Sequence, residues 1–223
     1  MSAGNNAETQ NVRILPAGLD GILSLPSERV SGLVVFAHGS GSSRLSPRNT
    51  EVATALQQRG LATLLFDLLS EREARDRRNV FDISLLAERL VAATGWARRN
   101  RLTQDLPFGY FGASTGAAAA LAAAAQSETD IAAIVSRGGR PDLAGGALVR
   151  VTAPTLLIVG GADIDVLTLN RAAAARMRCE HRIAVVPGAT HLFEEPGALE
   201  QVSELAGRWF LDHWPLPLEV VHP

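Results

Sequence analysis

A serine in a glycine-rich pentapeptide has the clearest capacity for chemistry in this chain. Ser114 stands at the centre of Gly112-Ala113-Ser114-Thr115-Gly116, the G-x-S-x-G pattern in which a strand turns sharply into a helix and exposes the serine hydroxyl. An apolar strand candidate, 108–111, comes directly before it, and the alanine-rich stretch 117–125, a strong helix former, comes directly after. The alternative is a tight strand–helix turn with a solvated serine. The context favours a nucleophile.

A serine nucleophile needs a base, and the base needs an acid that orients it. In the strand–turn–helix arrangement the chain order is serine, acid, histidine, each at the carboxyl end of a strand. Asp163 follows the strand candidate 155–159, and His191 follows the strand candidate 182–186. Asp165 is the rival acid, but its position favours capping the next helix. The order therefore predicts Asp163 and His191 as partners of Ser114.

A second glycine-rich turn, His38-Gly39-Ser40-Gly41, follows the early strand candidate 33–37. Such a turn can aim backbone N–H groups at the oxyanion of a tetrahedral intermediate. We expect one donor from the N–H of Thr115 and the other from Ser40 or Gly39. His38 is expected to brace the turn by hydrogen bonding.

The segments that must position these residues are of two alternating kinds, short apolar runs and longer stretches with helical spacing. Apolar runs without alternation are typical of strands covered on both faces, and their alternation with helical stretches predicts an α/β domain with a mostly parallel, doubly wound sheet. Segments 12–15 and 20–25 can form an antiparallel hairpin at the start. The strand candidates are 33–37, 62–66, 108–111, 131–135, 155–159 and 182–186, and the helix candidates are about 50–59, 82–100, 115–126, 167–178 and 197–213.

Composition narrows the classes of function. The chain has 223 residues, 47% of them hydrophobic, with a formal net charge of −2, which argues against a sequence-independent nucleic-acid binder. We expect a cytoplasmic protein without a membrane segment. The chain has a single cysteine, Cys179, and it shows neither a signal-peptide pattern nor a long apolar run. We expect one domain over 1–223, with irregular termini at 1–11 and 214–223. The charged stretch 70–78 is interpreted as a solvated loop or helix end, with a rim over a site as the alternative.

Three arginines stand near the expected site in sequence. Arg137 and Arg140 flank a Gly-Gly pair after the strand candidate 131–135. Arg44 follows the glycine-rich turn 38–41, which we call the oxyanion turn. The guanidinium fork suits a carboxylate or phosphate, so each is a candidate for substrate binding. The alternative for Arg137 and Arg140 is an ion pair with Asp142 or another acid that holds the loop.

These pieces together resemble the α/β-hydrolase superfamily, and within it the dienelactone-hydrolase-like branch. The segments HGSGSS, GYFGASTGAAAA, SRGGRPDLA, LLIVGGAD and VPGATHLFEEPG carry the resemblance, which covers about 12–212. They look like a bacterial group often associated with a phosphoribosyltransferase domain. The resemblance implies an eight-stranded, mostly parallel sheet with the triad at its carboxyl edge. The namesake enzymes carry cysteine where this chain has Ser114, which favours an ordinary carboxylic ester over dienelactone.

The function expected is a serine esterase for small carboxylic esters with short acyl chains, working without metal or organic cofactor. The short connection between Val135 and Ala153 leaves no room for a large lid. A lactonase, a dienelactone-type hydrolase or a thioesterase acting on an acidic substrate would use the same residues. A catalytically silent, ligand-binding member of the fold is the alternative from another class. The oligomeric state is left open, a homodimer included.

Overall fold

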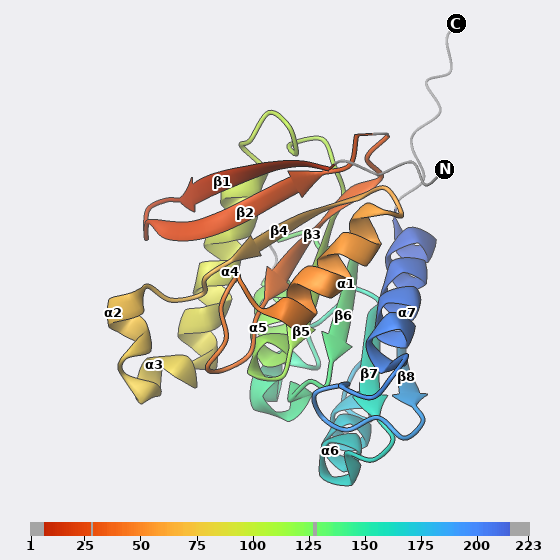
Figure 1. Cartoon of the computed structure of the whole chain (residues 1–223). Coiled ribbons are helices and arrows are strands. Elements are labelled where there is room, and N and C mark those ends of the chain that lie inside the picture. The colour runs from red at the N-terminus through yellow and green to blue at the C-terminus, as the bar shows by residue number, and fades with distance from the viewer. Residues whose placement is uncertain (1–6, 28, 127–128, 215–223) are drawn as a thin grey trace, which may run out of the picture.

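One eight-stranded sheet forms the centre of the molecule in the computed structural model, which describes residues 7–27, 29–126 and 129–214. The strand order is β1-β2-β4-β3-β5-β6-β7-β8, and every pairing from β4 to β8 is parallel (Figure 1). The first two strands pair antiparallel with each other, and β2 pairs antiparallel with β4. The strands are β1 (Glu8–Ile14), β2 (Leu19–Leu25), β3 (Gly32–Ala37), β4 (Leu61–Phe66), β5 (Phe108–Ala113), β6 (Ala133–Arg137), β7 (Thr155–Gly160) and β8 (His181–Val186).

Helices cover both faces of this sheet and divide the core in two. One apolar cluster lies under α4, α5 and α6, and the other lies under α1 and α7. The doubly wound α/β architecture predicted from the sequence is confirmed. The helices are α1 (Pro47–Gln57), α2 (Glu71–Ala74), α3 (Arg77–Val80), α4 (Ile83–Ala97), α5 (Thr115–Ala124), η1 (Pro141–Ala147), α6 (Ile164–Ala174) and α7 (Ala198–His213).

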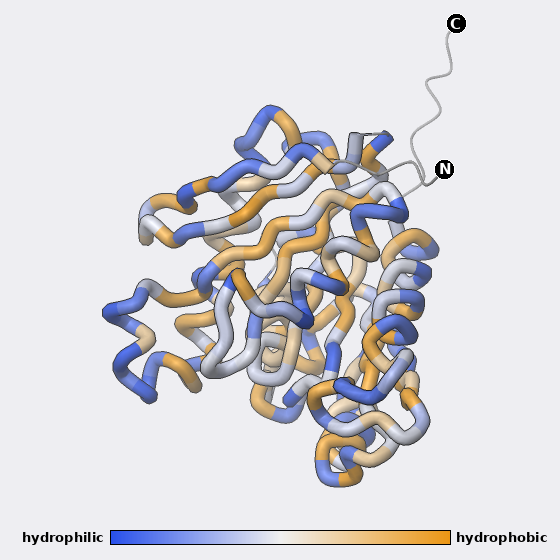
Figure 2. Tube along the Cα trace, viewed as in Figure 1, coloured by the Kyte–Doolittle hydropathy of each residue, from blue (hydrophilic) through white to orange (hydrophobic). Residues whose placement is uncertain are grey.

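The central strands are buried along their whole length. Every residue of β3, β4, β5, β6 and β7 is buried, and the central strands appear as continuous apolar segments in Figure 2. This is the pattern expected of parallel strands with helices on both faces. Edge strand β8 differs, because its first two residues are exposed and buried and exposed residues alternate toward its last residue. The unbroken apolar runs were therefore the correct signal for the parallel sheet.

Some boundaries differ from those predicted, for local reasons. The strand predicted at 131–135 lies at Ala133–Arg137, because Asp130 takes a positive φ of 43° and the chain joins the sheet only after it. Helix α1 begins at Pro47 because the Ser46 side chain caps it. Strand β1 begins at Glu8, inside the stretch 1–11 that was expected to be irregular. The rest of the predicted irregular termini, 1–6 and 215–223, lies outside the described residues.

The charged segment 70–78 folds into two short helices, α2 and α3. Ser70 and Glu73 form a reciprocal capping box at the start of α2, and Glu73 also pairs with Arg89 of α4 at 2.7 Å. Hydrogen bonding from Asn79 to the carbonyl of Glu73 joins the two helices. The segment is thus tied to α4 as capped helical turns, and Ser70, Glu71 and Ala74 line a cavity. The alternative of a mobile rim over the site stays a prediction.

The connection after β6 holds only the short helix η1, so no lid domain is inserted there. Among the described residues, no helix is long and apolar enough to cross a membrane.

The turn from β5 into α5 depends on two glycines that leave no space for a side chain. A Cβ at Gly112 would overlap Ala117 of the following helix, and a Cβ at Gly116 would overlap the carbonyl of Ala37 on β3. In both places the obstacle is backbone, which cannot rotate away. The glycines of the pentapeptide therefore allow the close helix–strand approach.

We expect Gly116→Ala to lower the free energy of unfolding by about 1–3 kcal/mol, because α5 must move away from β3. Gly95→Ala is the matched control: a Cβ there meets only the flexible Arg99 side chain, and removing a helix-interior glycine raises stability by about 0.5–1 kcal/mol. Urea unfolding measures both. Equal effects of the two substitutions would contradict the close approach at Gly116.

Candidate active site

Ser114 occupies a strained backbone position at the junction of β5 and α5. Its φ is 51° and its ψ is −121°, a conformation that non-glycine residues rarely adopt. Its N–H donates to the carbonyl of Arg137 at 3.2 Å, and its own carbonyl accepts from the N–H of Arg140 at 3.0 Å. The end of β6 and the loop after it therefore hold the turn in place.

His191 and Asp163 are brought together across two neighbouring strand ends. His191 Nδ1 lies 2.7 Å from Asp163 Oδ2. The carboxylate is the more sheltered partner, with 15% of its side chain exposed against 39% for the imidazole. A carboxylate at Nδ1 holds the imidazole with Nε2 free to accept a proton. The structure thus pairs the histidine and the acid that the chain order singled out.

Asp165 does not cap the following helix, contrary to expectation. Helix α6 begins at Ile164, so Asp163 itself occupies the N-cap position and Asp165 lies in the first turn. The Asp163 side chain makes no capping hydrogen bond and accepts from His191 instead. The helix begins earlier than the predicted 167, because Ile164 in its first turn is 63% exposed and does not extend the buried face of the helix.

Ser114 and His191 line the same small cavity, which has a volume of about 230 Å³. The oxyanion turn contributes Gly39 and Ser40 to its wall, and Arg137 contributes from β6. No hydrogen bond joins Ser114 Oγ to His191 within the part of the chain that the structure describes. In ligand-free sites such contacts are often long and shorten only when substrate binds.

The two parts predicted to form an oxyanion hole contact each other. The N–H of Ser40 donates to Thr115 Oγ1 at 2.9 Å, so this donor already has an acceptor. The N–H of Thr115 opens α5, where helix geometry provides no intrahelical acceptor. For Ser40 to serve as a donor, its N–H must be shared between Thr115 and the substrate. The choice between Ser40 and Gly39 stays a prediction.

His38 holds the oxyanion turn in place through two hydrogen bonds of its ring. Its Nδ1 donates to the carbonyl of Gly39 at 3.0 Å, and its Nε2 accepts from the N–H of Leu68 at 3.0 Å. This pair of bonds requires the neutral imidazole. Burial lowers the pKa of His38 below its ordinary value, although the Gly39 carbonyl and the charge of Asp67 oppose the shift. The ring is therefore neutral at physiological pH and links the turn to the end of β4.

Arg137 is buried at the cavity that Ser114 and His191 line, and none of the described acidic residues pairs with it. Only 7% of the residue is exposed, and its one side-chain hydrogen bond in the described structure goes to Asn49 Oδ1 at 3.2 Å. Its Nε has no partner among the described residues. Burial, together with the nearby charge of Arg48, lowers the pKa of Arg137 to about 10. A buried cation in this state favours an anionic ligand.

The other two candidate arginines are engaged elsewhere. Arg140 binds Asp142 through two hydrogen bonds, at 2.9 and 2.8 Å, which raises its pKa. This is the ion pair weighed as the alternative, and Arg140 does not line the catalytic cavity. Arg44 pairs with Asp67 and Asp20 and lines a different, neighbouring cavity.

Sequence reasoning missed three contributors to the site. Asn49 of α1 holds Arg137, and the ring of Phe193 lies beneath the same guanidinium, 5.9 Å from its carbon. A Cβ at Gly138 would meet His191 and Phe193. Gly138 stood in the Arg-Gly-Gly-Arg motif and could have been found there. Asn49 carried no signal, because only folding brings α1 beside β6.

A solved structure titled dienelactone hydrolase, from Anabaena variabilis, matches the chain with 52% identity and a TM-score of 0.89, over 95% of this chain and 99% of that one. This chain belongs to the dienelactone hydrolase family. Est1E from Butyrivibrio proteoclasticus shares the fold with a TM-score of 0.76 but only 16% identity, over 92% of this chain and 98% of that one. The resemblance expected from the motifs is confirmed at the level of family and fold.

Two Mycobacterium tuberculosis proteins are 60% identical to this dienelactone hydrolase family member over 198 residues and carry the provisional name phosphoribosyl transferase. The match covers 89% of this chain but only 44% of their length. The chain therefore spans less than half of the curated relatives it matches. A scan against protein-family models gave no match.

The hydrogen bonds of His38 predict a dependence of stability on pH. Because the folded protein favours neutral His38, the unfolded chain binds more protons as pH falls below about 6.5, and stability declines there. We expect the wild type to lose more unfolding free energy between pH 7.5 and 5.5 than His38→Gln, whose side chain does not titrate. Urea unfolding at both pH values measures this. The other histidines are common to both proteins, so equal losses would contradict the neutral brace.

Proposed function

We propose that the protein is a serine hydrolase that cleaves small carboxylic esters through an acyl-enzyme intermediate. The observation that carries the proposal is the shared cavity of Ser114 and His191, with His191 bonded to Asp163. The strained serine turn adds support, since this conformation presents a hydroxyl at the carboxyl edge of the sheet. The small cavity volume, about 230 Å³, favours a short acyl group beside the reacting carbonyl.

The mechanism has two acyl-transfer steps. His191 Nε2 takes the proton of Ser114 as Oγ attacks the ester carbonyl, and Asp163 stabilises the resulting imidazolium. The tetrahedral oxyanion accepts hydrogen bonds from the N–H of Thr115 and from a second donor of the turn, Ser40 or Gly39. His191 then protonates the departing alcohol. Water attacks the acyl-enzyme by the same route and releases the acid.

Ser114→Ala tests the nucleophile. We expect hydrolysis of p-nitrophenyl acetate to fall by about four orders of magnitude or more, because the acyl-enzyme can no longer form. A fluorophosphonate should add once to the wild type and not at all to the variant, as measured by intact mass.

Ser84→Ala, on the exposed surface of α4, is the control and should match the wild type in both assays. Turnover that survives in Ser114→Ala would contradict the assigned nucleophile. A wild type that neither labels nor hydrolyses would support the catalytically silent, ligand-binding alternative.

A second candidate function is hydrolysis of an ester, lactone or thioester that carries an anion. Arg137 favours it, because a buried guanidinium without an acidic partner faces the cavity that holds Ser114. A carboxylate fits the family, whereas a phosphate fits the provisional name of the mycobacterial relatives. Competition by succinate or by inorganic phosphate separates the two anions.

Arg137→Gln measures the contribution of this charge. A charge-assisted hydrogen bond contributes about 1.5–3 kcal/mol, so kcat/KM for a p-nitrophenyl ester with a terminal carboxylate should fall about 10- to 150-fold. The methyl-capped, neutral analogue should change far less. Arg140→Gln is the matched control, since Arg140 pairs with Asp142 outside the cavity. Equal losses of Arg137→Gln on both esters would assign Arg137 a structural role.

A further inference from the structure

A second, larger cavity lies on the other side of the oxyanion turn. Its volume is about 420 Å³ against about 230 Å³ for the catalytic cavity. Gly39, Ser40 and Ser42 line both cavities, so a single turn of backbone borders the two. Neither Ser114 nor His191 lines the larger one, and the chemistry proposed above does not use it.

The walls of the second cavity are apolar where they come from the core. Leucines from three elements or their ends line it, and Val80 of α3 and Ala74 of α2 complete it on the outer side. The leucines are Leu19, Leu68, Leu69 and Leu86, and each is at most 9% exposed. A cavity of this size and lining is typical of sites for small organic ligands.

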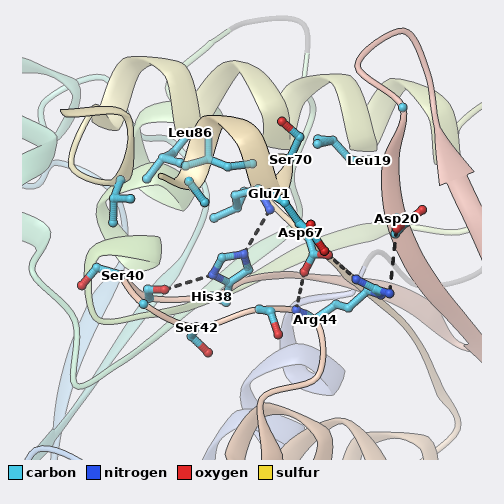
Figure 3. A pocket seen from close by; sticks show the side chains of 18 of the residues that line it. Leu19, Asp20, His38, Ser40, Ser42, Arg44, Asp67, Ser70, Glu71 and Leu86 are labelled. Atoms are coloured by element: carbon cyan, nitrogen blue, oxygen red, sulfur yellow. Dashed lines mark hydrogen bonds and ion pairs between the residues drawn. The ribbon is translucent and has the colours of Figure 1, made fainter. Parts of the chain in front are cut away.

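Both arginines at the same cavity are paired with acids, and the further charged residue of its lining, Glu71, is an acid. Arg44 binds Asp67 through its backbone and its guanidinium and lies 3.9 Å from Asp20, as Figure 3 shows. Arg13 also pairs with Asp20, at 3.6 Å. Arg137 of the catalytic cavity has no such partner in the part of the chain that the structure describes. The second cavity therefore does not select an anion, and its core side offers contact to an uncharged, apolar group.

We propose that this cavity is a substrate subsite for a neutral apolar group, an alkyl chain or an aromatic ring, attached to the ester bound at Ser114. The inference rests on the proposed function and extends it. One flank of the carbonyl is small and remains in the catalytic cavity. The other flank crosses the turn of Gly39 and Ser40 and packs against the leucines. The substrate is thus asymmetric, with a compact side and a larger apolar side.

The shared turn also explains how a group bound in the second cavity would affect the position of the reacting carbonyl. His38 lines the second cavity and holds the Gly39 carbonyl through Nδ1. Figure 3 shows the ring between the turn and the strand end that carries Asp67. A group seated in the cavity contacts the same backbone that supplies a predicted oxyanion donor. Binding energy gained there is available to position the ester.

Substitutions that fill the cavity from its outer side test the subsite. Ala74 is exposed and lines the cavity, so Ala74→Trp adds bulk without disturbing the core. Val80→Phe fills it from α3 instead. Arg75→Trp is the matched control, because Arg75 is also exposed and is the next residue, but lies outside the lining. Two ester series are compared, one lengthened in the acyl chain and one in the alcohol.

In one of the two series we expect wild-type kcat/KM to rise by up to about fourfold for each added methylene until the cavity is full. The rise should disappear in Ala74→Trp and Val80→Phe and persist in Arg75→Trp, which should also hydrolyse acetate esters of small alcohols like the wild type. A neutral fluorescent probe, N-phenyl-1-naphthylamine, should bind Ser114→Ala, and lose affinity at least tenfold when Ala74→Trp is added.

The outcomes separate the subsite from the proposed function. Ser114-dependent hydrolysis with identical chain profiles in all four proteins would overturn the subsite and leave the esterase intact. Absence of hydrolysis, with probe binding that Ala74→Trp abolishes and Arg75→Trp retains, would overturn the esterase and retain an apolar ligand site. Probe binding that Ala74→Trp leaves unchanged would overturn the subsite whatever the activity.

Discussion

The close approach of backbone at the turn around Ser114 is the constraint on which the site depends. Gly116 lies against the carbonyl of Ala37 with no space for a Cβ, which places α5 beside β3. The N–H of Ser114 is held by the carbonyl of Arg137 on the other neighbouring strand. Strands β3, β5 and β6 thereby meet at one point. Backbone contacts of this kind are rigid, so the serine keeps its strained conformation without help from its own side chain.

Two cavities of contrasting character border this point. The catalytic cavity contains a buried guanidinium, Arg137, that lacks an acidic partner in the described structure. In the larger cavity, Arg44 is paired with Asp67 and Asp20, and four leucines line the side toward the core. Burial makes an unpaired charge costly and a paired one tolerable. We therefore propose an anion for one cavity and an apolar group for the other, with the turn of Gly39 and Ser40 between them.

Much of this arrangement could be predicted from the sequence, although the predictions failed at identifiable places. The sheet was recognisable because unbroken apolar runs mean burial on both faces. Asp165 is not the helix cap because α6 already begins at Ile164, whose exposed side chain does not extend the buried face of the helix. The strand predicted at 131–135 starts later because Asp130 adopts a positive φ. No local sequence pattern indicated that conformation. Arg137 and Arg140 looked equivalent in sequence, yet among the described residues Arg140 pairs with an acid and Arg137 does not.

The sequence by itself determined the strands, the longer helices and the order of Ser114, Asp163 and His191, because glycine spacing and hydrophobic periodicity act over a few residues. The short helices α2, α3 and η1 were not among the predicted helices. Only the tertiary structure decided which charges are paired. Asn49 reaches Arg137 from 88 residues away along the chain, and Ser40 reaches Thr115 from 75 residues away. The second cavity arises likewise from segments that meet only in space. Ion pairing, burial and cavity shape are properties of packing between distant segments, and local sequence does not encode them.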